Sequence, residues 1–84
     1  MIEIIVQFNI KYPYYKSIEL IFDFSQLWGL KLIQTSTNSD LVIISFPWKT
    51  FKKIFGYNPQ KGPLDLPNPL NVFINEAHII KIEI

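Results

Sequence analysis

The chain has 84 residues, of which 49% are hydrophobic and 15% aromatic, so it has enough apolar length for a folded domain and is not a disordered tail. It contains no cysteine and one histidine, which excludes disulfides, thiolate metal sites, a cysteine nucleophile and a cluster of histidines around a metal. Its basic residues are eight lysines and no arginine, against seven carboxylates, for a net charge of +1.

The first part of the chain predicts a strand followed by a helix. Residues 2–8 alternate between two faces and are rich in β-branched side chains, which is typical of a strand. Residues 14–28 place apolar side chains at helical spacing, with charged side chains on the opposite side. Pro13 suits the first turn of this helix, and Gly29 stands where a C-terminal cap belongs.

A hairpin and a shorter helix are expected next. Residues 30–35 and 41–46 each predict a strand, and the turn-forming residues at 37–39 between them predict a hairpin. Residues 48–55 place apolar side chains on one side and lysines on the other, which predicts a short amphipathic helix that ends at Gly56.

The C-terminal part predicts a long loop and a last strand. Residues 57–71 contain several prolines and predict a loop, and long loops in small domains are often functional. Residues 72–77 predict either one helical turn or the start of a strand. Residues 78–84 alternate again and predict the last strand, with Ile80 and Ile82 on one face.

This order of elements predicts an α+β fold of the ferredoxin-like βαββαβ type. We expect a four-stranded antiparallel sheet in the order 4-1-3-2, with two helices on one face, and residues 1–84 forming a single domain. The alternative is an open αβ meander in which the second helix is too short to count.

No group of residues has the pattern of a catalytic site. His78 has no evident partner in the sequence, and Glu19 and Asp23, one helical turn apart, are more typical of a solvated helix face than of paired catalytic acids. The three glycines do not cluster, so there is neither a phosphate-binding loop nor a dinucleotide fingerprint. We therefore predict a protein that is not an enzyme, with no catalytic residues, no metal and no cofactor.

The sequence also argues against a specific nucleic-acid partner. Specific recognition of phosphates and bases relies on arginine, which is absent, although an AT-rich genome would have the same effect. Lys49, Lys52 and Lys53 are typical of the solvated face of a short helix, with a phosphate or an acidic partner as the alternative. Phe8 and Phe46 fall on the inward register, so they are not expected to stack on bases.

The sheet face away from the helices is expected to be unusually apolar. The face toward the helices is expected to carry Ile4, Val6, Val42, Ile44, Ile80 and Ile82. The opposite face is expected to carry Ile5, Ile33, Leu41, Ile43 and Ile79. Since an apolar patch with a polar rim is typical of a partner surface, we predict that this face binds another protein. The alternative is that it binds a second copy of the chain, in a dimeric regulatory or ligand-sensing domain. Scattered surface isoleucines in an isoleucine-rich proteome are the alternative.

Two segments resemble the prodomains of subtilisin- and kumamolisin-like serine proteases. In residues 41–60 a strand runs into a short helix that ends in the pair Phe55-Gly56, before a loop with prolines. In residues 66–84 a short turn leads into the last strand. The resemblance implies a ferredoxin-like chaperone or inhibitor that binds a serine protease through its outer sheet face. Standalone inhibitors of the same fold are similar to such prodomains.

The proline-rich loop is a second candidate binding surface. In prodomains the residues after the last strand enter the protease active site, whereas this sequence stops at Ile84, inside the expected strand. We therefore expect binding to use the sheet face and the loop. The candidate loop residues are Pro59, Pro63, Leu64, Leu66 and Pro67.

The N-terminus lacks the pattern of a secretory signal. It has no basic region and no small-residue cleavage site, and Glu3 interrupts its apolar run. The uncharged apolar stretches are far shorter than the ~18–20 residues that a membrane helix needs. We expect a cytoplasmic protein with no membrane segment.

Overall fold

A computed structural model describes residues 2–11, 14–36, 40–68 and 70–83 as a mixed α+β structure. Its elements are β1 (Glu3–Ile10), α1 (Tyr14–Trp28), β2 (Lys31–Ser36), β3 (Leu41–Pro47), α2 (Trp48–Phe55), β4 (Gly62–Leu64), α3 (Leu70–Phe73) and β5 (Ile74–Glu83). Four features of the sequence analysis lie outside the described residues: Pro13, the turn at 37–39, residue 69 of the expected loop, and Ile84.

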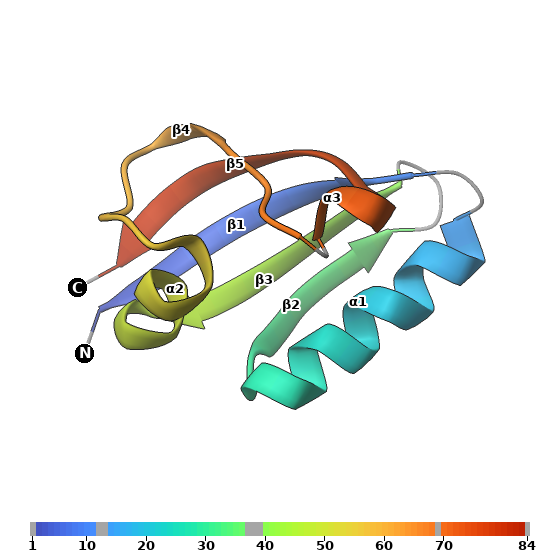
Figure 1. The fold of residues 1–84 in the computed structure, drawn as a ribbon, viewed down its shortest axis with the longest axis horizontal. Coiled ribbons are helices and arrows are strands. Elements are labelled where there is room, and N and C mark those ends of the chain that lie inside the picture. Colours follow the sequence, from blue (N-terminus) through green and yellow to red (C-terminus); the bar gives the residue numbers. More distant parts are fainter. Residues whose placement is uncertain (1, 12–13, 37–39, 69, 84) are drawn as a thin grey trace.

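The described strands form one antiparallel sheet in the order β2-β3-β1-β5-β4 (Figure 1). The four longer strands keep the predicted order, because β5 takes the place of the expected fourth strand. The prediction of only four strands and two helices is wrong. Residues 62–64 pair with β5 inside the expected loop, and residues 70–73 form an additional helical turn.

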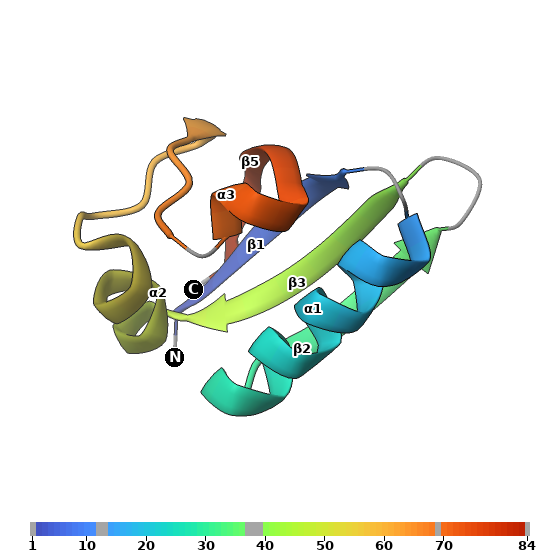
Figure 2. The ribbon, with the colours of Figure 1, turned by 45° about the vertical axis from the view of Figure 1, so that its right-hand side comes forward.

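The core lies between one face of the sheet and the described helices, which all pack on that face (Figure 2). Alternation along β1 and β3 turns the predicted inward residues to this side, where they are buried. The sheet contributes Ile4, Val6, Phe8, Val42, Ile44 and Phe46 to this core, and the helices contribute Ile21, Phe24, Phe51, Phe55, Leu70 and Phe73.

Phe46 is the centre of an aromatic cluster that holds α2 against the sheet. It is fully buried, and its ring centroid lies 6.0 Å from that of Phe8, 6.1 Å from Phe51 and 5.8 Å from Phe55. These separations and the tilted or edge-to-face angles are the favoured geometry for aromatic pairs. The cluster explains why a helix of two turns is stable beside the sheet, as isolated helices of this length are not.

The predicted end of α2 is confirmed. Gly56 has a positive φ of 83°, and its backbone N–H donates to the carbonyl oxygen of Lys52 at 2.9 Å. This left-handed C-terminal cap is favourable for glycine because it has no Cβ. Since Phe51 and Phe55 face inward, Lys52 and Lys53 are exposed on the opposite side of α2, as a solvated helix face requires.

The last strand contains a β-bulge that reverses part of the predicted alternation. β1 pairs Ile5 with Lys81 but Val6 with Ile79, so Ile80 is an extra residue in β5. Ile79 is consequently in the core at 3% exposure, and Ile80 is 42% exposed. The predictions that Ile80 faces the helices and that Ile79 lies on the opposite face are both wrong, because strict alternation does not foresee an inserted residue.

No helix among the described residues has the length and apolar character needed to cross a membrane.

Because of the bulge, we expect Ile79 and Ile80 to contribute unequally to the free energy of unfolding. Ile79→Ala should lower the free energy of unfolding by about 2–5 kcal/mol, because it removes buried methyl groups and leaves a cavity. Ile80→Ala should lower it by less than about 1 kcal/mol, because this side chain is largely exposed. Urea denaturation of the two variants measures the difference. A larger loss for Ile80→Ala would show that β5 lacks this bulge.

Candidate functional site

The face of the sheet opposite the core, here called the open face, is covered by none of the described helices (Figure 2). Its side chains come from β1, β3, β5 and β2, and they form three cross-strand rows. The rows are Lys81–Ile5–Ser45–Lys31, His78–Gln7–Ile43–Gln34 and, across three strands, Glu76–Asn9–Leu41. Within these four strands, polar side chains occupy both ends of the first two rows and one end of the third. On the edge strand β4, exposed Pro63 pairs with His78 and extends the second row.

Apolar side chains lie in the middle of the open face. Ile43 and Leu41 alternate on β3, and Ile5 lies diagonally across from Ile43 on β1, so the three form a continuous strip. Ile5 is only 8% exposed, and Leu41 and Ile43 are half-buried. The strip therefore presents only part of its apolar surface to solvent.

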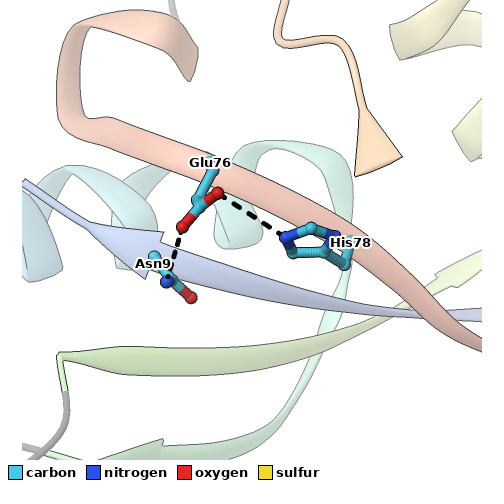
Figure 3. Close-up of polar contacts among 3 residues, drawn as sticks. All are labelled: Asn9, Glu76 and His78. Carbon is cyan, nitrogen blue, oxygen red and sulfur yellow. Dashed lines mark hydrogen bonds and ion pairs between the residues drawn. The ribbon is translucent and has the colours of Figure 1, made fainter. Parts of the chain in front are cut away.

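A polar cluster borders this strip on β1 and β5 (Figure 3). The amide Nδ2 of Asn9 donates to Oε1 of Glu76 at 3.3 Å, and His78 Nε2 lies 3.7 Å from Oε2 of the same carboxylate. Glu76 and His78 are two residues apart on one strand, so their side chains project from the same face of β5. His78 therefore has a carboxylate neighbour, and the spacing of two residues between Glu76 and His78 on a strand is the sequence signal that indicates it.

Two common catalytic arrangements are absent around this cluster among the described residues. Among the described residues, no serine or threonine hydroxyl forms a hydrogen bond with His78. Within the same ranges, no three His, Cys, Asp or Glu side chains are placed to hold a metal ion. The predicted absence of enzymatic activity stays a prediction.

Two polar atoms on the open face have unused hydrogen-bonding capacity. Asn9 Oδ1 and Ser45 Oγ are buried and have no hydrogen-bond partner within the described part of the chain. Buried polar groups in proteins are usually paired, with protein atoms or with ordered water.

The predicted apolar patch is only partly assembled. Ile5, Leu41 and Ile43 lie together as expected, whereas Ile79 is in the core on the other side of the sheet. Ile33 is exposed on the edge strand β2, at a register shift between Leu32 and Gln34. The register gives Ile33 no paired residue on β3, so the strand pairing does not place it in the strip.

Most of the candidate loop residues are buried or half-buried in the folded chain. Pro59 and Leu64 are buried, and Leu66 and Pro67 are half-buried, with Leu66 packed against the core. Only Pro63 of the five candidates is exposed, opposite His78 on the edge strand β4. The five side chains therefore do not form one exposed surface, because the segment adds a strand at the edge of the sheet, and their use in binding stays a prediction.

A polar hollow of about 500 Å³ lies beside β4. It is lined by Tyr57, Asn58, Gln60, Lys61, Pro63, Leu64 and Ile79. Partial burial raises the pKa of the Tyr57 phenol above its ordinary 10.0, a hydrogen bond with the backbone of Asp65 opposes this rise, and the charge of the Asp65 carboxylate adds to it. The phenol is therefore neutral at physiological pH and available as a hydrogen-bonding group.

No protein-family model, no curated protein and no solved structure matches this chain. The resemblance of residues 41–60 and 66–84 to serine protease prodomains stays a prediction.

The partial burial of Tyr57 predicts that its phenol ionises at a higher pH than in the unfolded chain. Since the folded chain holds this phenolic proton to a higher pH than the unfolded chain, its contribution to stability is complete below pH 10.0 and is lost as the pH rises through the folded pKa. Absorbance titrations of wild type and Tyr57→Phe measure this ionisation. The tyrosinate signal that wild type shows and the variant lacks should titrate above pH 10.0. If this difference signal titrated at or below pH 10.0, the result would contradict the partial burial of the Tyr57 phenol.

Proposed function

We propose that this chain is a non-enzymatic protein-binding module that docks through the open face of its sheet. The observation that carries the proposal is the strip of Ile5, Ile43 and Leu41 in the centre of a face on which no described helix packs. An antiparallel sheet with one face in water usually places polar side chains along its central strands on that side. A face of this kind is stabilised when a partner removes its apolar centre from water.

The fold that we propose is ferredoxin-like with an added edge strand. In support, the four longer strands have the order β5-β1-β3-β2, and α1 connects two strands that are separated by β3. The described helices lie on one face of the sheet, and β4 extends its edge beyond β5. This arrangement supports the use of the opposite face for binding.

The charges around the strip favour a protein surface over a nucleic acid or a uniformly charged partner. Lys31 and Lys81 lie at the two ends of one row, and Glu76 ends another. Lys81 Nζ also lies 3.3 Å from Oε1 of Glu83, so part of the positive charge is already neutralised. A mixed rim around an apolar centre is the usual composition of a protein–protein interface.

The partner class that we propose is a serine protease of the subtilisin type, which this chain would inhibit. The support is the prodomain resemblance together with the open, partly apolar sheet face, since prodomains use that face. The expected cytoplasmic location also stays a prediction.

Self-association is the second candidate function. The strip lies on the central strands β1 and β3, so two copies related by a two-fold axis could stack their open faces and bury it. The same face also carries both lysines and carboxylates, so a second copy offers opposite charges to it.

Substitution of Ile43 tests the open face. Wild type should inhibit subtilisin cleavage of a chromogenic peptide, and Ile43→Asp should weaken inhibition by about tenfold or more, because it places a charge in the apolar centre. Ile43→Thr keeps the β-branched shape that suits a strand, so it should weaken inhibition less. It serves as a second variant if Ile43→Asp does not fold. The control is Phe22→Gln, an exposed position on α1, and circular dichroism melts confirm that each variant folds.

The outcomes separate the two candidate functions. Equal inhibition by wild type and Ile43→Asp would exclude the open face as the inhibitory surface, and no inhibition by wild type would exclude the protease as partner. Sedimentation over a wide range of concentration tests self-association. A dimer that Ile43→Asp dissociates would support the second candidate, and a monomer at all concentrations would exclude it.

A further inference from the structure

The outer edge of β2 is a free edge of the sheet. Among the described strands, β2 has β3 as its one neighbour, so the backbone N–H and C=O groups on its other side have no strand to pair with. Lys31, Ile33, Gln34 and Thr35 of this strand are exposed, so α1 does not cover it. The occupant that suits an uncovered edge is an extended strand, because only a strand offers matching backbone groups along its length.

The two edges of the sheet differ in their protection against such pairing. β4 forms the opposite edge with only 3 residues, and Pro63 in its middle has no backbone N–H to donate. β2 has 6 residues, contains no proline and carries one charge, that of Lys31 at its first position. Natural sheets protect their edges with short strands, prolines and charges. β2 has little of this protection, and Ile33 near its middle is 48% exposed.

The register shift at Ile33 makes β2 match a reversed copy of itself. Leu32 pairs with Ile44 and Thr35 pairs with Val42, and both of these β3 residues are in the core. Because side chains alternate along a strand, positions 32 and 35 would be on opposite faces without the shift. With it, Leu32 and Thr35 share the core side of the sheet. Two antiparallel copies of β2 therefore keep like faces together when Leu32 of one copy lies opposite Thr35 of the other.

The charges near this edge suit the same arrangement. Lys31 would lie opposite position 36 of the second copy, so the two lysines are at opposite ends of the joint. Asp40 is exposed at the end of the sheet where Lys31 of the second copy arrives, because β3 begins beside position 36. On α1, exposed Lys16 and Glu19 lie toward this end and have opposite charges, so they add no net charge there (Figure 1). A second copy thus brings a cation toward a carboxylate at each end.

We infer that two copies of this chain pair antiparallel through the free edges of β2 and form one continuous sheet across a two-fold axis. The axis passes at Ile33 and Gln34, so the two Ile33 residues become neighbours across the joint. Such a contact uses the same surface in both copies and satisfies both free edges at once. Assembly stops at two copies, because the outer edges of the joined sheet are those of β4 with Pro63.

This pairing does not cover the open face, so the inference is independent of the proposed function and differs from stacking of two open faces. A joint of one strand per copy buries less area than the ~1,600 Å² of a standard interface. We therefore expect a dimer that dissociates on dilution.

Sedimentation velocity from about 1 µM to about 500 µM tests the inference. Wild type should change from monomer to dimer over this range. Ile33→Lys should weaken dimerisation by about tenfold or more, because it brings two positive charges together at the axis. The matched control is Ile80→Lys, since Ile80 is also an isoleucine at a register shift and is 42% exposed, but lies on the inner strand β5. This control should dimerise as wild type does.

Mixing of oppositely charged variants tests the two-fold axis. Ile33→Glu alone should dimerise as poorly as Ile33→Lys. An equimolar mixture of the two should recover most of the lost affinity, because residue 33 then meets an opposite charge in the other copy. This recovery would also exclude unfolding of the variants as the cause of the loss.

A cysteine probe tests the register. The chain contains no cysteine, so a single introduced thiol reports one position. Gln34→Cys places the two thiols beside the axis, within the distance that a disulfide can span, and should give a covalent dimer with oxidised glutathione. Ile80→Cys should stay monomeric on a non-reducing gel.

Several results would overturn the inference. They are a wild-type monomer at all concentrations, equal losses in Ile33→Lys and Ile80→Lys, or no recovery in the mixture of charged variants. A dimer that Ile43→Asp dissociates and Ile33→Lys does not would show that the copies stack through their open faces instead.

Discussion

The central position of β1 is the constraint on which both the core and the open face depend. β1 is paired on one side with β3 and on the other with β5, so its register determines which side chains of all three strands face the helices. Ile4, Val6 and Phe8 point into the core, whereas Ile5 and its alternating neighbours form the middle of the open face. A slip of one residue would exchange the two sets, and the burial of the inward side chains prevents it.

The short helices are present because they complete this core. α2 has only two turns, and its stability comes from Phe51 and Phe55, which pack against Phe46 of β3. α3 is a single turn that buries Leu70 and Phe73. Because α3 is so short, a groove remains between it and α1 on the surface.

Much of the fold could be predicted from local pattern. Alternation in residues 2–8 and 41–46 and helical spacing in residues 14–28 and 48–55 indicated the main elements, and Gly56 indicated the end of α2 correctly. On the open face, the alternation of Ile5, Leu41 and Ile43 was sufficient to place these three together. Such patterns are readable because they reflect which side of an element meets the core, and this is decided within a few residues of the chain.

The sequence by itself determined the α+β class, the long strands, two helices and the apolar strip, whereas the tertiary structure decided the features that depend on pairing partners. The bulge at Ile80 exists only in relation to the register of β1, so alternation placed Ile79 and Ile80 on the wrong faces. β4 forms because the edge of β5 is available for pairing. The sequence does not indicate this strand, because glycine and proline are uncommon inside strands. The contact of Asn9 with Glu76 joins residues 67 positions apart, and local periodicity holds no information about such distances.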